Sequence, residues 1–184
     1  MKKLTEKELT ETANADLTKQ DYSAREKVVG VVVSESKRFI DDGGEFVEIV
    51  RAEAKGALQG FAGFVPAQFS WSVLEKGRVK GVHLHMNQED VWFVPPSSTL
   101  LIGLKDCRKD SKTHDVVQRL VLGAGRAHLL YIPRGVAHGY KALSEHSELF
   151  YFVNRHFSPD VKKSDEYRLP IDSFGQGFWD YTPS

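Results

Sequence analysis

The 184-residue chain contains a single cysteine, Cys107, so an internal disulfide framework is excluded. It also has no net charge, because 25 lysine and arginine residues balance 25 aspartate and glutamate residues. We therefore expect no nucleic-acid partner and no membrane partner. No cationic–apolar leader opens the sequence, and no apolar run approaches the length of a membrane-spanning helix. These absences predict a cytoplasmic protein.

The composition is that of a soluble globular protein, with 41% hydrophobic and 27% charged residues. A chain of this length can build one domain with a substantial core. Residues 1–26 are polar and show no core-forming pattern, so we expect an N-terminal arm with a short helix within Leu4–Thr12. Residues 27–184 are expected to form the single folded domain.

From Val28 onward, the sequence consists of short β-type runs separated by Gly, Pro, Ser and Asp clusters. No long amphipathic helix interrupts them, so the pattern predicts an all-β antiparallel barrel or jelly roll. The tail from Asp165 mixes polar residues with Phe174, Phe178, Trp179 and Tyr181, which favours a segment lying across the barrel. The expected strands are Val28–Val33, Glu45–Arg51, Gln68–Leu74, Val79–Met86, Val91–Val94, Leu100–Leu104, Val116–Leu122, His128–Ile132 and Leu149–Val153.

Two histidines stand two residues apart in one of these runs, so a strand would point His83 and His85 to the same face. With Glu89 they follow the spacing of the first half of the metal-binding pattern of cupins, and Pro133-x-Gly135-x2-His138 is similar to the second half. Imidazoles and a carboxylate that converge from adjacent strands suit Fe, Mn, Ni or Zn. The match is imperfect, because the expected glycine is Pro96 and the expected asparagine is Ala142.

A second resemblance covers more of the chain. Residues Phe39 to Trp179 resemble the dTDP-4-dehydrorhamnose 3,5-epimerase family. The resemblance implies a cupin double-stranded β-helix with short peripheral helices, a nucleotide-sugar substrate, no metal, no cofactor, and a homodimer. It rests on the order of Phe39–Glu48, Gln68-x-Ser70-x-Ser72 with Gly77, Lys80–His83, Asp106–Thr113, Ile132–Gly139, Leu143–Glu145, Phe150–Pro159 and Pro170–Asp172.

The family's reaction removes a proton next to a ketone from one face of the sugar and returns a proton on the other face. By resemblance, His83 is the general base, Asp172 orients it and Tyr151 donates the proton on the opposite face; histidine titrates near neutrality, as a base requires. The substrate-binding residues that the resemblance implies are Phe46, Glu48, Gln68, Lys80, His85 and His138.

The chain departs from the family pattern at four places. Gly43 stands where the family has an arginine, and Lys80 replaces another arginine, which removes a bidentate donor for phosphate. The lysine that would stabilise the enolate oxygen falls near Asp90 or Val91, and the family does not explain His85. Strand parity also places Lys80 opposite His83, so Lys80 reaches the pocket only if Gly81 permits a bulge.

Three hypotheses follow, in order of preference. The first is a metal-independent epimerase or isomerase of a nucleotide-linked 4-keto-6-deoxy sugar, using His83, Asp172 and Tyr151. The second is a metal-binding cupin that uses His83, His85, Glu89 and His138. The third is a non-catalytic sugar-binding cupin. The first two compete for His83, since a metal-bound imidazole cannot also act as a free base.

Overall fold

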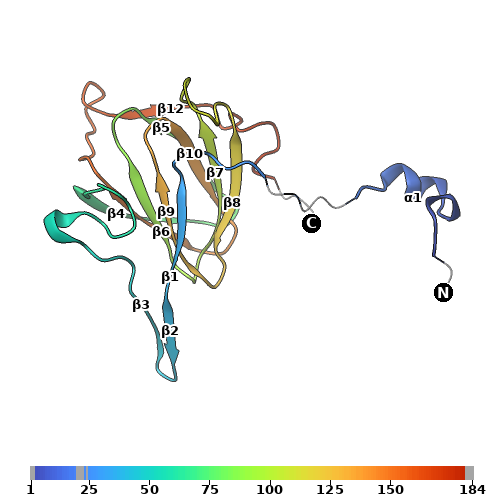
Figure 1. The fold of residues 1–184 in the computed structure, drawn as a ribbon, viewed down its shortest axis with the longest axis horizontal. Coiled ribbons are helices and arrows are strands. Elements are labelled where there is room, and N and C mark those ends of the chain that lie inside the picture. Colours follow the sequence, from blue (N-terminus) through green and yellow to red (C-terminus); the bar gives the residue numbers. More distant parts are fainter. Residues whose placement is uncertain (1–2, 20–22, 24, 181–184) are drawn as a thin grey trace.

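The computed structural model describes residues 3–19, 23 and 25–180, and its strands form two five-stranded antiparallel sheets that face each other as a barrel (Figure 1). The first sheet has the order β1-β9-β6-β11-β4, and the second has the order β12-β5-β10-β7-β8. The strands are β1 (Val32–Ser36), β2 (Arg38–Asp41), β3 (Gly44–Val47), β4 (Gln68–Leu74), β5 (Val79–His85), β6 (Asp90–Val94), β7 (Thr99–Asp106), β8 (Val117–Gly123), β9 (Ala127–Ile132), β10 (Val136–Ala142), β11 (Ser147–Val153) and β12 (Glu166–Arg168).

The all-β jelly-roll prediction is confirmed. Three strands were not expected from the sequence: β2, β10 and β12. β10 is rich in small and polar residues, yet it pairs with β5 on one side and β7 on the other, so neighbouring strands impose its conformation. β12 has only three residues and is defined by its pairing with β5. The expected strand Val28–Val33 begins later, at Val32.

One end of the barrel interior is packed with apolar side chains, and this packing supports the site. The cluster takes inward-facing residues from both sheets, so it ties the two sheets together. Burial of each such side chain stabilises the fold by about 1.5–3 kcal/mol. Its fully buried members include Val94, Leu100, Ile102, Leu104, Leu130, Ile132 and Leu149.

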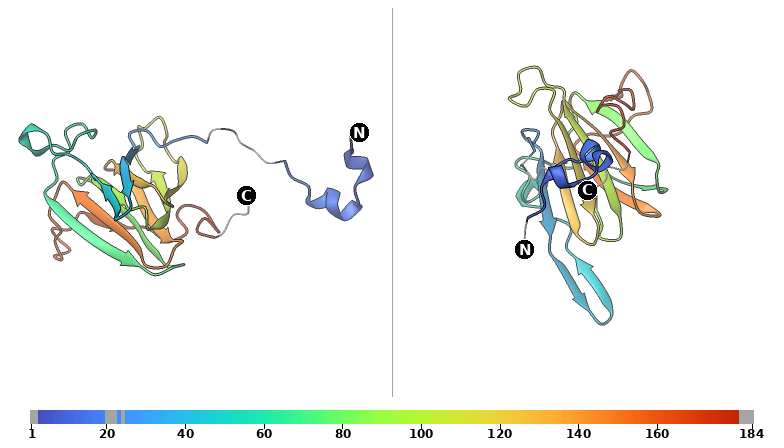
Figure 2. Two further views of the ribbon diagram at one scale, coloured as in Figure 1. Left: turned by 90° about the horizontal axis from the view of Figure 1, so that it is seen from below. Right: turned by 90° about the vertical axis from the view of Figure 1, so that its right-hand side faces the viewer.

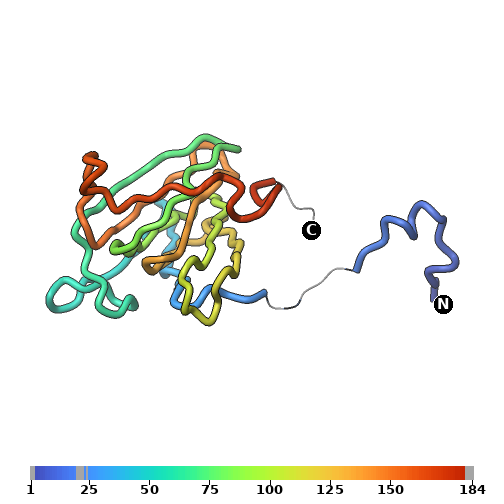
Figure 3. The backbone as a smooth tube through the Cα atoms, turned by 90° about the horizontal axis from the view of Figure 1, so that it is seen from above, coloured from blue at the N-terminus to red at the C-terminus, as the bar shows by residue number. Residues whose placement is uncertain are grey.

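The outer faces of the two sheets are covered by irregular segments. Leu58, Phe61 and Phe64 pack on the outer face of the first sheet. Phe174 and Trp179 are buried in one cluster with Val82, Leu101 and Ala137 of the second sheet, so the predicted course of the tail is confirmed for them. Figure 3 shows the backbone of the C-terminal segment, in red, running along the barrel. Tyr181 lies outside the described residues.

The N-terminal segment contains a 3₁₀ turn, η1 (Glu6–Glu8), and a short helix, α1 (Glu11–Asp16). The helix predicted within Leu4–Thr12 is therefore misplaced, because that range holds η1 and only the first two residues of α1. Neither element has a buried residue, and α1 lies away from the barrel (Figures 1 and 2). A second 3₁₀ turn, η2 (Ala54–Gly56), precedes β4. In the described part of the chain, no helix is long and apolar enough to cross a membrane.

Strands β2 and β3 form a separate hairpin that projects from the barrel (Figure 1). Its turn contains Asp41–Gly44, where Gly44 has a φ of +142° and Asp41 Oδ1 accepts a hydrogen bond from Gly43 N. The side chains of Phe39, Ile40 and Phe46 are exposed on this hairpin.

Candidate active site

The open end of the barrel holds a cavity of about 940 Å³ between the two sheets. Polar side chains occupy its interior, in contrast with the apolar packing at the other end. This volume suits a small-molecule ligand. The inner residues include His83 and His85 from the second sheet, and Asp90, Trp92 and Tyr151 from the first.

Strand alternation explains which residues reach the cavity from the first sheet. On β4, Gln68, Ser70 and Ser72 line the cavity, whereas Phe69 and Trp71 point outward and are exposed. On β11, Leu149, Tyr151 and Val153 line it by the same parity. The inward side chains also fix each other, since Ser72 Oγ lies 2.7 Å from the Tyr140 hydroxyl.

Lys80 lines the cavity because the pairing of β5 with β10 is irregular at this point. His138 pairs with His83 but Gly139 pairs with Gly81, so the register shifts by one residue. The sequence required such a bulge for Lys80 to reach the pocket, and the bulge is present. Gly81 permits it, since a Cβ there would lie 2.7 Å from Gly139 Cα and 2.9 Å from His138 O.

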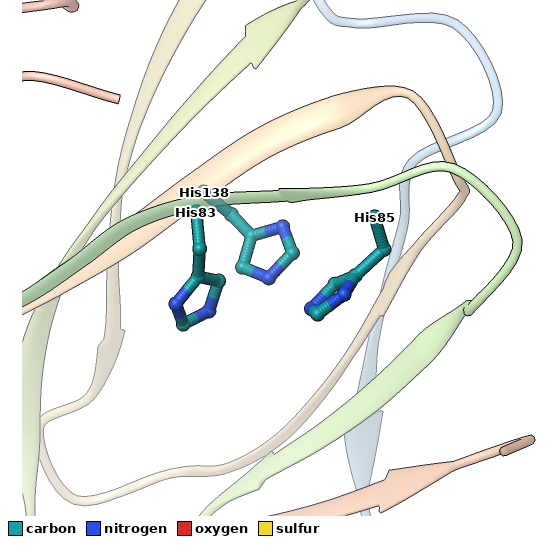
Figure 4. Close-up of side chains that lie close together, drawn as sticks. All are labelled: His83, His85 and His138. Atoms are coloured by element: carbon teal, nitrogen blue, oxygen red, sulfur yellow. The ribbon is translucent and has the colours of Figure 1, made fainter. Parts of the chain in front are cut away.

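Three imidazoles meet at the wall formed by β5 and β10, as Figure 4 shows. One ring nitrogen from each of His83, His85 and His138 lies within 4.8 Å of the others. The ring centroids of His83 and His138 are 4.5 Å apart in an edge-to-face arrangement. Each of the other two pairs is 5.4 Å apart.

Backbone carbonyls fix the tautomers of two of these rings. His85 Nδ1 is 2.9 Å from Asp165 O, and His138 Nδ1 is 2.9 Å from Val136 O. A carbonyl can only accept, so each Nδ1 carries the proton and each Nε2 presents a lone pair. His85 Nε2 accepts from Gln88 Nε2 at 3.3 Å, whereas buried His138 Nε2 has no hydrogen-bond partner among the described residues.

His83 is the most accessible of the three histidines. Its Nδ1 is buried without a hydrogen-bond partner among the described residues, and it lies 3.8 Å from Glu166 Oε1. Arg168 forms an ion pair with the same Glu166 carboxylate. Burial and the adjacent imidazoles of His138 and His85 lower the pKa of His83 to about 2, so the ring is neutral at physiological pH.

Tyr151 faces the histidines from the opposite sheet, since β11 belongs to the first sheet and β5 to the second. Burial is the main cause that raises the pKa of its hydroxyl, and a hydrogen bond with Ser70 acts in the opposite direction. The phenol therefore stays protonated at neutral pH and can donate a proton. A ligand between the sheets would have His83 on one face and Tyr151 on the other.

The structure places Asp172 away from the cavity. Its side chain is exposed and does not line the cavity. The neighbouring Phe174 packs against Val82 on the outer face of β5, whereas His83 points inward from the same strand. Strand alternation thus separates Asp172 from His83, and the carboxylate that faces His83 is Glu166.

Glu89 also lies outside the histidine cluster. Its carboxylate faces Arg134 Nε at 3.9 Å and Asn154 Nδ2 at 3.4 Å. Glu89 comes directly before Asp90 of β6, and Asp90 and Trp92 point into the cavity. Because neighbouring side chains of a strand alternate, Glu89 points to the other face of the sheet. The buried Asp90 instead lies 3.8 Å from His138 Nε2 and accepts hydrogen bonds from Gln88 and Trp92.

Two other expected substrate contacts, Phe46 and Glu48, do not line the cavity of this chain. Phe46 is 62% exposed on β3, and Glu48 pairs with Arg51 at 2.7 Å. Gln68, Lys80 and His85 do line the cavity, and His138 is buried beside His83 and His85 without lining it. Gln68 also donates to Ser70 Oγ through Nε2 and accepts from Phe157 N through Oε1.

The main residues that the sequence did not identify come from the segment after β11. Glu166 lies on the three-residue β12, too short to show a hydrophobic period. Arg155, Lys162 and Lys163 line the cavity from a loop, and nothing in the local sequence indicates where they point. Asp90 offered a usable signal, because a carboxylate heads the otherwise apolar strand Asp90–Val94.

Comparison with known proteins agrees with this geometry. Residues 25–170 match the family model described as dTDP-4-dehydrorhamnose 3,5-epimerase. The chain is 37% identical over 150 residues to the spore coat polysaccharide biosynthesis protein SpsL of Bacillus subtilis, covering 81% of this chain and 93% of that protein.

Solved structures show the same fold. The dTDP-4-dehydrorhamnose 3,5-epimerase from Sulfolobus tokodaii has a TM-score of 0.67 at 28% identity, covering 79% of this chain and 80% of that chain. The enzyme of the same name from Bacillus anthracis, solved with TDP and PPi bound, has a TM-score of 0.65 at 25% identity. That match covers 79% of this chain and 85% of the other.

Proposed function

The chain belongs to the dTDP-4-dehydrorhamnose 3,5-epimerase family and is a sugar epimerase, and from this premise we propose its substrate and mechanism. The substrate is a nucleotide-diphosphate-linked 4-keto-6-deoxy sugar, and the reaction is proton transfer at a carbon next to the ketone, without metal or cofactor. The observation that supports this most is the placement of His83 and Tyr151 on opposite sheets across one cavity.

His83 acts as the general base in this proposal. A Nδ1–H directed toward Glu166 leaves the Nε2 lone pair free to accept the proton. The C–H bond breaks, its electron pair moves to the ketone oxygen as an enolate, and the proton passes to the imidazole. Glu166, whose Oε1 lies 3.8 Å from His83 Nδ1, orients the ring and stabilises the imidazolium; a direct hydrogen bond requires this distance to shorten when the substrate binds.

Tyr151 completes the inversion from the other face. Its hydroxyl gives a proton to the enolate carbon and the ketone re-forms. Solvent then takes the proton from the His83 imidazolium and returns one to the tyrosinate, so both residues regain their starting states. Lys80, which lines the cavity on the histidine side, supplies positive charge for the enolate oxygen. A preorganised cation of this kind lowers a barrier by a few kcal/mol. No electrons are exchanged with another molecule, so the step requires no redox cofactor.

A three-histidine metal centre is a second candidate, favoured by the nitrogen geometry. His85 and His138 donate Nδ1–H to carbonyls and present Nε2, as metal-binding histidines usually do. Two nitrogens bound to one zinc are about 3.4 Å apart, so small ring movements would be needed. We rank it second because Gln88 already donates to His85 Nε2 and because Glu89 supplies no fourth ligand.

We further propose a cytoplasmic homodimer. Phe46 lies on β3 of the projecting hairpin, Glu48 follows β3 directly, and neither lines the cavity of its own chain, which suits a contribution to the cavity of a second copy. Exposed Phe39 and Ile40 on the hairpin, and Phe69 and Trp71 on β4, supply apolar surface for pairing. The exposed free Cys107 suits a reducing compartment.

The function is tested by incubating the purified protein with dTDP-4-keto-6-deoxyglucose in deuterium oxide, before and after chelation, alongside metal analysis. We expect deuterium at a carbon next to the ketone and full activity in the metal-free protein. Stoichiometric metal that is lost in His85→Gln, together with loss of activity on chelation, would establish the metal centre instead. No deuterium incorporation into any of several nucleotide-linked keto sugars would reject the epimerase proposal.

A further inference from the structure

Tyr140 places a phenol hydroxyl in the cavity on the same wall as His83. Its strand, β10, pairs with β5 in the second sheet, and the residue lines the cavity. Tyr140 and Lys80 are direct partners across these two strands. The pair Gly81–Gly139, which has no side chains, separates them from His83 in the same ladder. A ligand next to His83 would therefore meet the side chains of Lys80 and Tyr140 directly beside it.

The surroundings of Tyr140 fix its ring and leave the hydroxyl at the cavity. The residue is 4% exposed, and it belongs to the apolar cluster inside the barrel. Trp92 of β6 meets the ring edge to face, with the two centroids 5.5 Å apart. The hydroxyl lies 2.7 Å from Ser72 Oγ on β4, so this hydrogen bond joins the two sheets. When Ser72 donates it, the phenol proton is free for a ligand.

The phenol of Tyr140 keeps its proton at neutral pH. Burial is the main cause that raises the pKa of its hydroxyl, and the hydrogen bond with Ser72 acts in the opposite direction. A fixed neutral hydroxyl is suited to donate to an oxygen that becomes negative during a reaction. The neighbouring imidazole of His85 is not suited to this task, because its Nδ1–H is directed to Asp165 O and its Nε2 presents a lone pair.

The enolate of the proposed reaction requires donors close to the base. The electron pair left at the carbon moves to a ketone oxygen two bonds away, so the groups that stabilise this oxygen must lie beside His83. Asp90, near the position of the family's lysine, is a carboxylate that accepts hydrogen bonds from Gln88 and Trp92. An ionised carboxylate has no proton to donate. The task therefore falls to donors on the histidine wall.

We propose that the Tyr140 hydroxyl donates a hydrogen bond to the enolate oxygen, next to the charge of Lys80, and that Ser72 positions this hydroxyl. Tyr140 keeps its proton throughout, so the proton that inverts the carbon still comes from Tyr151. The inference rests on the proposed function and adds a catalytic residue to its mechanism.

The rates of deuterium exchange and of epimer formation by Tyr140→Phe, with dTDP-4-keto-6-deoxyglucose as the substrate, test the proposal. This variant lacks only the hydroxyl. Both rates should fall together by about 100-fold with little change in KM, because exchange and inversion share the enolate. Loss of a group that protonates the carbon would instead stop epimer formation and leave exchange. Tyr131→Phe makes the same change at a residue that does not line the cavity, and it should leave both rates unchanged.

Thermal melts and calorimetric binding of thymidine diphosphate, which lacks the keto sugar, check the fold of Tyr140→Phe; both should match the wild type. Wild-type exchange by a folded Tyr140→Phe would overturn the proposal, and so would loss of epimer formation with exchange retained. If Tyr140→Phe does not fold, Ser72→Ala provides the same comparison. This variant should slow exchange and epimer formation together by a smaller factor, and wild-type rates would overturn the proposal.

The wild-type protein separates this inference from the proposed function. Exchange by the wild type with an unaffected Tyr140→Phe would reject only the role of Tyr140. Absence of exchange by the wild type on several nucleotide-linked keto sugars would reject the proposed function, and with it any role of Tyr140 at an enolate.

Discussion

At the scale of single residues, the site depends on which groups point into the barrel. His83 and Tyr151 were identified from the sequence because a motif surrounds each of them, and both line the cavity. Asp172 also stood in a matching motif, but the tail that contains it packs outside the sheet. A sequence match fixes the order of residues along the chain. It does not fix the side of the sheet on which a tail lies.

The carboxylate assignment gives the first prediction. Glu166→Gln should lower kcat by roughly 10- to 100-fold, because an amide cannot stabilise the imidazolium as a carboxylate does. Asp172→Asn makes the same chemical change at an exposed position and should leave kcat unchanged. Steady-state kinetics of both variants, with thermal melts as a folding check, decide which of the two carboxylates acts on His83. A large loss in Asp172→Asn with normal activity in Glu166→Gln would reverse the assignment.

At the scale of strands, the sequence predicted the elements with an alternating pattern or a continuous apolar run, and it missed β2, β10 and β12. β4, with Gln68, Ser70 and Ser72 facing inward, was predicted over the same residues as observed. β10 was missed because hydrogen bonds to β5 and β7 define it, rather than its own side chains. The bulge at Gly81 was anticipated only as a condition for Lys80 to reach the cavity.

That bulge gives the second prediction. Gly81→Ala should destabilise the fold by about 3 kcal/mol, because its Cβ would overlap the backbone of β10. Gly77→Ala is the matched control, since Gly77 has a φ of +79° but nothing within 4 Å of an added Cβ. It should cost only about 1 kcal/mol. Urea denaturation measures both values, and equal losses in the two variants would contradict the role given to the bulge.

The projecting hairpin gives the third prediction. Phe46→Asp should shift the protein from dimer to monomer, because it places a charge on an exposed apolar hairpin. Val161→Asp is the control, because Val161 is exposed in a loop outside the hairpin and β4. Light scattering coupled to size-exclusion chromatography reports the mass. A wild-type protein that runs as a monomer would remove the dimer proposal.

At the scale of the whole molecule, the barrel keeps the imidazoles of His83 and His138 neutral by burying them between two sheets. His138 is 2% exposed, and burial lowers its pKa to about 4 against a partial opposing effect of Asp90. The unfolded chain protonates a histidine near pH 6.5. Stability from this group is therefore fully present above pH 6.5 and is lost as the pH falls toward 4.

The fourth prediction follows from this difference. When the pH falls from 7 to 5, protonation of His138 in the unfolded chain alone should reduce the free energy of unfolding by on the order of 2 kcal/mol. Protonation of His83 in the unfolded chain should add to this decrease. His138→Gln should show a smaller decrease over the same interval, because glutamine does not titrate. Denaturation curves at pH 7, 6 and 5 provide the measurement. An equal decrease in the free energy of unfolding of the wild type and of His138→Gln would contradict the role given to His138.

The claim that His83 and Tyr151 act from opposite faces is tested most directly by following deuterium and stereochemistry together in Tyr151→Phe. This variant should still exchange the substrate proton for deuterium, because His83 can remove and return it on one face, but it should form no epimer. His83→Asn should abolish both exchange and epimer formation. Normal epimer formation by Tyr151→Phe, or retained exchange by His83→Asn, would contradict the assignment of the two residues.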